Sequence, residues 1–129
     1  MSVIPDSHRD LLERPLIGHL ATLRDDGYPQ TNPMWFAWDG EHLRFTTTDT
    51  RRKHRNVVAR PQVAVSVVDP DSPYRYLEVR GLVVRIEPDP EGAFFLALAQ
   101  RYGMPHESAP ADAAHRVVLV VEPTATTRQ

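Results

Sequence analysis

The sequence predicts a mainly β protein, a small six-stranded antiparallel barrel with short helices at its rim. Apolar and polar residues alternate with a period of two in most apolar segments, which favours antiparallel strands. Turn signals such as Asp25-Asp26-Gly27 and Asp39-Gly40 separate neighbouring segments. The order of the predicted strands and helices is hard to lay out as an open sheet, whereas closure into a barrel removes the exposed edges.

The individual elements follow from these signals in chain order. We expect strands over residues 16–24, 29–38, 41–48, 62–68, 75–87 and 115–122. We expect helices over residues 6–13, 51–59 and about 90–102, and an irregular loop over 104–113. Gly81 is expected at a bulge or bend. Asp49-Thr50 would cap the second helix, Asp89-Pro90 would begin the third, and Gly103 would end it.

The composition restricts the function classes. A length of 129 residues suits one domain over residues 1–129. The absence of cysteine excludes disulfides, thiolate metal sites and a cysteine nucleophile, and it fits a reducing compartment. Neither a signal peptide nor a membrane-spanning run is visible, so we expect a cytoplasmic protein without a membrane partner. The net charge of −2 gives no general attraction to nucleic acid.

Conventional catalytic motifs are missing from the sequence. There is no glycine-rich nucleotide loop, no GxSxG nucleophile motif and no HExxH zinc motif. The six histidines form no HxH or HxxxH pair, so we expect no metal site. The paired acids Asp25 and Asp26 belong to a turn, where a solvated role is favoured over acid/base catalysis. We therefore expect no catalytic side chain and a function that depends on a bound group.

The segment Thr46–Arg55 concentrates hydroxyl and cationic side chains at a predicted helix start. A helix N-terminus offers free N–H donors and a partial positive charge, and it binds phosphate. Positive residues in the first turn repel the helix dipole, which costs stability unless an anion compensates. Fourteen of the fifteen basic residues are arginine, so Lys53 stands out as the only lysine. A solvated basic helix face and a nucleic-acid patch are the alternatives.

The segment Asn32–Trp38 combines a proline with apolar and aromatic residues. Because Pro33 cannot donate to a strand ladder, it indicates an edge, a bulge or a split between strands. Met34, Trp35 and Phe36 could wall a flat aromatic ligand. The alternative is that these residues belong to the core or to a dimer interface, and the two interpretations are compatible.

Taken together, these segments resemble the split β-barrel family of flavin- and deazaflavin-dependent oxidoreductases, which is related to pyridoxamine-5′-phosphate oxidase. The resemblance rests on Gly27–Gln30, Pro33–Phe36, Lys53–Val57 and Arg60–Val63 in this order, and it extends over residues 11–123. The actinobacterial branch that uses the deazaflavin coenzyme F420 is the more similar one.

The resemblance implies an FMN-binding type of split barrel that forms a homodimer with cofactor sites at the interface. The ring would lie along one strand, the phosphate at the basic helix, and the partner subunit would contribute residues near Tyr74–Tyr76. Arg52 and Arg60 would suit the acidic tail of the deazaflavin. The implied cofactor-binding residues are Asn32, Pro33, Met34, Trp35, Phe36, Thr46, Thr47, Thr48, Arg51, Lys53, Arg55, Asn56 and Tyr76.

The function implied by this resemblance is hydride transfer between F420 and a small organic substrate whose identity stays open. FMN is the less favoured alternative cofactor. The basic cluster has more cations than a single phosphate needs, which favours the deazaflavin. One alternative is a flavin, deazaflavin or tetrapyrrole binding protein without turnover. A further alternative is a structural dimer that has lost its site.

Overall fold

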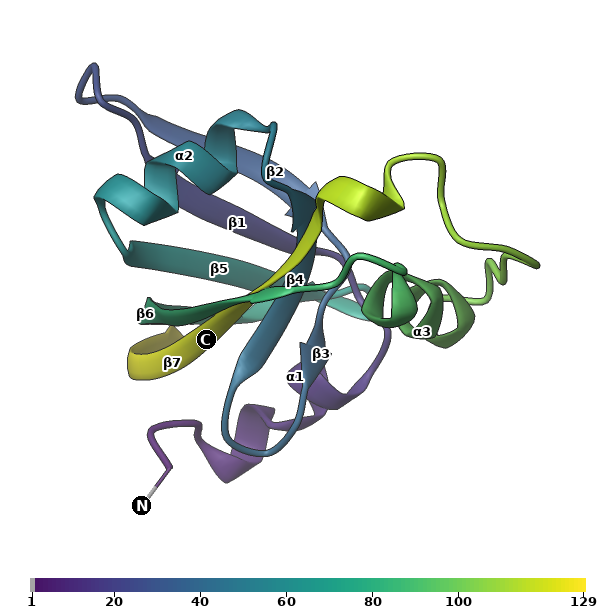
Figure 1. Ribbon diagram of the computed structural model, residues 1–129. Helices are drawn as coiled ribbons and strands as arrows, with labels where there is room; N and C mark the ends of the chain where they lie inside the picture. Colours follow the sequence, from purple (N-terminus) through teal and green to yellow (C-terminus); the bar gives the residue numbers. More distant parts are fainter. Residues whose placement is uncertain (1) are drawn as a thin grey trace.

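The computed structural model describes residues 2–129, which form one antiparallel seven-stranded sheet curled into a half-barrel (Figure 1). The strand order is β2-β1-β5-β6-β7-β4-β3. The strands are β1 (Gly18–Leu23), β2 (Pro29–Met34), β3 (Ala37–Trp38), β4 (Leu43–Thr48), β5 (Gln62–Asp69), β6 (Ser72–Pro88) and β7 (Arg116–Arg128). The α-helices are α1 (Asp10–Glu13), α2 (Arg52–Ala59) and α3 (Ala93–Arg101), and the 3₁₀ turns are η1 (Asp6–His8) and η2 (Ala113–His115).

The helices lie around the outside of the curled sheet, and buried apolar side chains fill its interior. Helix α2 packs against β1, and α1 packs against β3 and β5 (Figure 1). Phe36 and Phe45 are fully buried at the centre of the core, with ring centroids 6.1 Å apart. The core residues alternate along the strands, as the period-two pattern predicted; they include Leu20, Leu43, Val63, Val65, Val67, Leu77, Val79, Leu119 and Val121.

The sheet bends along the long strand β6. It pairs with β5 on one side and β7 on the other, and the β6–β7 register shifts next to Gly81 and again between Val83 and Arg85. Such shifts bend a strand and increase its twist. A Cβ at Gly81 would meet the backbone of β7 and would stand 2.9 Å from Val121 Cγ1. Only glycine therefore allows β7 to approach here, and the bend predicted at Gly81 is confirmed.

The strand predicted over residues 29–38 is two strands, so the sheet has seven strands rather than six. Trp35 and Phe36 lie between β2 and β3. The N–H of Phe36 donates to the Tyr102 hydroxyl at 3.0 Å instead of joining a strand ladder. The last strand also runs further than predicted, to Arg128, because its second half continues to pair with β6.

Two of the predicted helix starts are wrong in detail. Helix α2 begins after Arg51, and neither Asp49 nor Thr50 caps it; the Thr50 hydroxyl instead bonds to a neighbouring hydroxyl, and Asp49 pairs with His115. Helix α3 begins at Ala93 rather than at Pro90, although the Asp89 carboxylate does accept bonds from N–H groups in its first turn.

The predicted end of α3 is confirmed. Gly103 has a φ of +71°, and its N–H donates to the carbonyl of Gln100. The N–H of Met104 donates to the carbonyl of Ala99 at 2.9 Å. This pair of bonds is a Schellman motif, which requires a left-handed residue after the helix.

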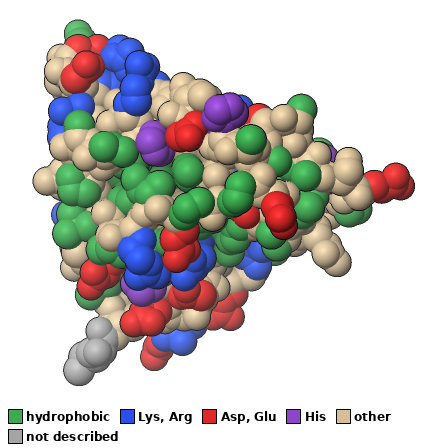
Figure 2. All heavy atoms as spheres, in the orientation of Figure 1, with side chains coloured by type: hydrophobic (Ala, Val, Ile, Leu, Met, Phe, Trp, Pro, Cys, Tyr) green, Lys and Arg blue, Asp and Glu red, His purple; other side chains and the backbone are tan. Residues whose placement is uncertain are grey.

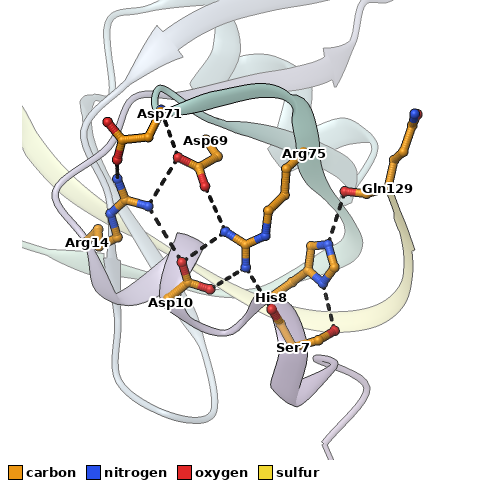
Figure 3. A network of polar contacts seen from close by, with 8 residues as sticks. All are labelled: Ser7, His8, Asp10, Arg14, Asp69, Asp71, Arg75 and Gln129. Atoms are coloured by element: carbon orange, nitrogen blue, oxygen red, sulfur yellow. Dashed lines mark hydrogen bonds and ion pairs between the residues drawn. The ribbon is translucent and has the colours of Figure 1, made fainter.

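A charged network joins the N-terminal helices to the β5–β6 turn (Figure 3). Arg75 donates to Asp10 Oδ1 at 2.6 Å and to Asp69 Oδ2 at 2.9 Å. Arg14 completes the network by pairing with Asp69 and Asp71. The pKa of Asp10 is lowered chiefly by its hydrogen bond from Arg75, and the pKa of Asp69 is lowered by the backbone of the turn and then by Arg75. The network therefore adds ion pairs with the β5–β6 turn to the packing of α1, whose Leu11 and Leu12 are buried in the core.

The surface of the described residues has two further features. Hydrophobic side chains reach the surface across the middle of the face in Figure 2, while Lys and Arg side chains form one group at its upper left and another below the middle, mixed with Asp and Glu. Within residues 2–129, none of the helices has the length and apolar character needed to cross a membrane.

Candidate functional site

A hollow of about 260 Å³ is lined by residues from the N-terminal end of α2, the start of β7 and the first turn of α3. The register between β4 and β7 brings these parts together, because Thr48 pairs with Arg116. The hollow is lined by Pro33, Met34, Trp35, Thr46, Arg51, Lys53, Phe95 and Arg116. Three of these eight residues are cations, and the others are apolar or aromatic apart from one threonine.

Lys53 is the most deeply placed cation of this hollow. Its residue is only 6% exposed, and among residues 2–129 no hydrogen bond or ion pair engages its ammonium group. The pKa of Lys53 is lowered, first by burial and then by the charges of Arg51 and Arg116. The ammonium nitrogen reaches the hollow while its stem is buried. A partly desolvated charge without a partner is costly, and an anion bound in the hollow would offset that cost.

The N-terminus of α2 opens beside this lysine. Arg51 stands at the N-cap position with extended backbone angles, and no side chain caps the first N–H groups. The first turn carries no acidic residue. Free N–H donors and the positive end of the helix dipole therefore add to the two cations, Arg51 and Lys53, which is a suitable environment for a phosphate group.

Arg116 completes the cationic lining from the other side of the hollow. Its side chain is 10% exposed and makes a two-point bond to Asp112, with Nε–Oδ1 at 2.9 Å and Nη2–Oδ2 at 3.0 Å. Its guanidinium carbon lies 4.7 Å from the centre of the Phe95 ring. No site role for Arg116 was predicted from the sequence, because 64 positions separate it from Arg52 and only strand pairing brings the two segments together.

An aromatic wall flanks the cations. Trp35 stacks on Tyr102 with ring centroids 5.1 Å apart and an interplanar angle of 14°, and it lies 6.4 Å from Phe95. The Tyr102 hydroxyl donates to the carbonyl of Leu16 at 2.6 Å, and burial raises the pKa of this phenol. Because the hydroxyl also accepts from Phe36, Tyr102 fixes the break between β2 and β3 that presents Trp35 to the hollow.

Arg101 anchors the last turn of α3 next to this wall. Its guanidinium donates to the backbone carbonyls of Leu12, Glu13, Arg14 and Phe36. Four acceptors from two separate segments therefore converge on one side chain. Helix α3 is held against the N-terminal segment and against the chain that carries Trp35.

The structure gathers six of the predicted site residues around this hollow. These six are Pro33, Met34, Trp35, Thr46, Arg51 and Lys53. Asn32 stands at the preceding position of β2 and accepts a bond from the Gln30 side chain at 3.0 Å. Phe36 is fully buried in the core and does not line the hollow.

The predicted threonines do not share one role. Thr47 is 1% exposed and lies on the core side of β4, where its hydroxyl has no partner among residues 2–129. Thr48 is also buried, and its hydroxyl bonds to Thr50 at 2.9 Å. Of the three, only Thr46 lines the hollow. Thr47 points to the opposite face of the strand, and the Thr48 hydroxyl is engaged by Thr50.

Arg55 and Asn56 lie on another side of α2. They line a separate hollow of about 210 Å³, together with Asp25, Arg52, Ala59 and Arg60. Asn56 is 2% exposed and donates to Thr22 Oγ1 at 2.9 Å, which ties the helix to β1. Arg52 pairs with Asp25, and Arg60 donates to a carbonyl of β1, so the residues expected to suit an acidic tail adjoin this second hollow.

Tyr76 lies apart from both hollows within the chain. It stands on β6 opposite Val68, and its backbone bonds to Gln129 in both directions. Its expected role depends on a second subunit and stays a prediction.

The curled antiparallel sheet is typical of a split-barrel protein, and it carries a cationic hollow next to an aromatic wall. The sequence matches the pyridoxamine 5′-phosphate oxidase family over residues 4–129, and the chain belongs to that family. The family resemblance and the split-barrel fold expected from the sequence are thereby confirmed.

Solved structures give the same assignment. A protein named F420 reductase is 63% identical, with a TM-score of 0.95 over 98% of this chain and 100% of that chain. A putative pyridoxamine 5′-phosphate oxidase from Listeria innocua is 23% identical, with a TM-score of 0.74 over 95% of each chain. A conserved hypothetical protein from Mycobacterium tuberculosis is 23% identical, with a TM-score of 0.76 over 98% of this chain and 84% of that chain. The last two show the fold alone, and no curated protein matches the sequence.

Proposed function

We propose that the chain is an oxidoreductase that uses the deazaflavin coenzyme F420, with FMN as the alternative cofactor, to reduce or oxidise a small organic substrate. The observation that carries this proposal is Lys53, a buried residue whose ammonium group has no partner among residues 2–129, at the hollow beside the Trp35 wall. The 63% identity to a protein named F420 reductase supports the deazaflavin over the flavin.

The residues of the hollow fit such a cofactor. Arg51, Lys53 and Arg116 carry three positive charges, and within the described residues 2–129 the only carboxylate bonded to any of them is that of Asp112. An anionic phosphate would offset this excess, and the aromatic wall suits a flat ring. When bound, the cofactor supplies hydride chemistry, while the protein supplies binding, orientation and exclusion of water.

We also propose that two copies of the chain associate through the outer face of β1, β5 and β6. Leu23, Val68 and Leu82 are exposed large apolar residues of these strands. A shallow apolar hollow of about 150 Å³, formed by β1, β5 and the first residue of β2, adjoins Leu23. Tyr76 stands opposite Val68 in the β5–β6 pair, so a second copy on this face would come close to it. Analytical ultracentrifugation of wild type and Leu82→Arg tests this, and an unchanged dimer in the variant would place the interface elsewhere.

The proposed function is tested by titrating the protein with F420 and, separately, with FMN, followed by fluorescence. We expect Lys53→Met to weaken binding of the preferred cofactor by roughly 10- to 100-fold, because a hydrogen-bonded charge pair contributes about 1.5–3 kcal/mol. Arg85→Met is the control, since Arg85 is an exposed arginine away from the hollow. Equal affinity of wild type and Lys53→Met would refute the site.

Turnover separates an enzyme from a carrier that uses the same site. Wild type loaded with reduced F420 is mixed with candidate electron acceptors, and reoxidation is followed by absorbance. Oxidation that depends on both protein and acceptor supports the enzyme. Tight binding without turnover for any acceptor class would indicate a binding protein.

A further inference from the structure

Arg116 is built into the hollow with one edge of its guanidinium occupied and another free. Nε and Nη2 are both taken by Asp112, at 2.9 and 3.0 Å. Nη1 has Thr46 Oγ1 at 3.4 Å, a long and weak contact for a charged donor. The side chain is 10% exposed and sits over the Phe95 ring, so its position is fixed by packing as well as by the carboxylate.

The charges around Arg116 are not balanced. Asp112 compensates one positive charge, while Lys53 and Arg51 have no carboxylate partner among residues 2–129. The pKa of Lys53 is lowered first by burial and then by the charges of Arg51 and Arg116, and both Lys53 and Arg116 line the hollow. Two nearly buried like charges on facing walls of one hollow repel one another unless an anion lies between them.

Resting on the function proposed above, we propose that Arg116 is a direct ligand of the cofactor's phosphate group and that Asp112 positions it. The anion is then held between α2 and β7, by Lys53 on one wall and Arg116 on the other, rather than by the basic helix alone. Arginine suits this place because its planar fork can bond a carboxylate along one edge and present another N–H to an anion.

A purely structural role for Arg116 makes a different prediction. If the side chain only joins the segment before β7 to Phe95, its removal weakens every ligand of the hollow equally. If it bonds the phosphate, its removal weakens only ligands that carry one. The two roles are therefore separated by comparing F420 with the deazaflavin chromophore that lacks the phosphate-bearing tail, and FMN with riboflavin.

The experiment measures these four affinities by fluorescence titration for wild type, Arg116→Met, Arg116→Lys and the surface control Arg85→Met. We expect Arg116→Met to weaken the phosphate-bearing ligands by roughly 10- to 100-fold and the others by less than about threefold. Arg116→Lys keeps the positive charge but loses the planar guanidinium, so its affinity for the phosphate-bearing ligands should fall between those of wild type and Arg116→Met. Equal losses for both kinds of ligand, or no loss, would overturn the proposal.

Asp112→Asn tests the positioning role. We expect it to weaken only the phosphate-bearing ligands, by less than Arg116→Met does, because Arg116 keeps its charge but loses its orientation. Tighter binding would show that Asp112 merely competes with the anion, and it would overturn the positioning role. Far-ultraviolet circular dichroism checks that each variant is folded.

The outcome is also decided if wild type binds neither cofactor. In that case the proposed function fails, and inorganic phosphate alone becomes the probe. A rise in melting temperature with phosphate that is lost in Arg116→Met, but kept in Arg85→Met, still supports Arg116 as an anion ligand. Equal stabilisation of all three proteins, or of none, overturns it.

Discussion

The Tyr102 hydroxyl connects three parts of the chain, and its removal should have a measurable cost. It donates to Leu16 at 2.6 Å and accepts from the Phe36 N–H at 3.0 Å. Each such bond contributes about 1 kcal/mol, and the Phe36 N–H would be left without its partner in Tyr102→Phe. We therefore expect the variant to lose about 2 kcal/mol of unfolding free energy, while the phenyl ring can keep its stacking on Trp35.

Urea unfolding followed by tryptophan fluorescence measures this loss directly, because Trp35 stacks on the altered ring. A shift of the urea midpoint without a change of slope would indicate a loss of stability rather than of compactness. Tyr28→Phe is the matched control, since Tyr28 is 71% exposed. A loss below about 0.5 kcal/mol in Tyr102→Phe would refute the reasoning, because both bonds would then contribute nothing beyond what water supplies.

Acidification should lower the free energy of unfolding, because it protonates the carboxylates that pair with Arg75. Because the folded-state pKa values of Asp10 and Asp69 are lowered, their contribution is complete above the unfolded value of about 4 and is lost as pH falls through the folded values. Arg75→Met should flatten this fall in the urea midpoint below about pH 4, and an identical pH profile in the variant would contradict it. Gly81→Ala should lose about 2 kcal/mol by overpacking against Val121 and the β7 backbone, and a melting temperature equal to wild type would show that the strands can part without cost.

Local signals in the sequence predicted most of the elements. Turn residues such as Gly27 and Gly40 adopt the positive φ that the predicted hairpins required, at 86° and 93°. Pro33 correctly indicated an edge strand next to a split, because a missing N–H has consequences that any fold must satisfy. These features depend on a few neighbouring residues, so the sequence alone was sufficient.

Features that depend on pairing between distant segments were beyond such reasoning. Arg116 reaches the hollow only because β7 pairs with β4, and nothing in its neighbourhood along the chain indicates that partner. Alternation along the strand predicted that Thr47 shares a face with Leu43 and Phe45, but the segments that border the Thr46 side depend on the pairing of β4 with β7. The capping role expected of Asp49 failed for a related reason, since the approach of His115 gives this carboxylate another partner.

The bonds made by Arg101 and Tyr102 bear on how this protein can change over generations. Both side chains bond to backbone atoms, which every residue type supplies, so substitutions at the accepting positions leave the anchor intact. The anchor also stands immediately before the exposed segment 103–109. Gly103 and Met104 close α3, and His106 packs edge-on against Phe95, so the freedom to vary lies at residues 107–109. Changes there can reshape the surface near Phe95 while the stack of Trp35 on Tyr102 keeps its position and the sheet stays unaltered.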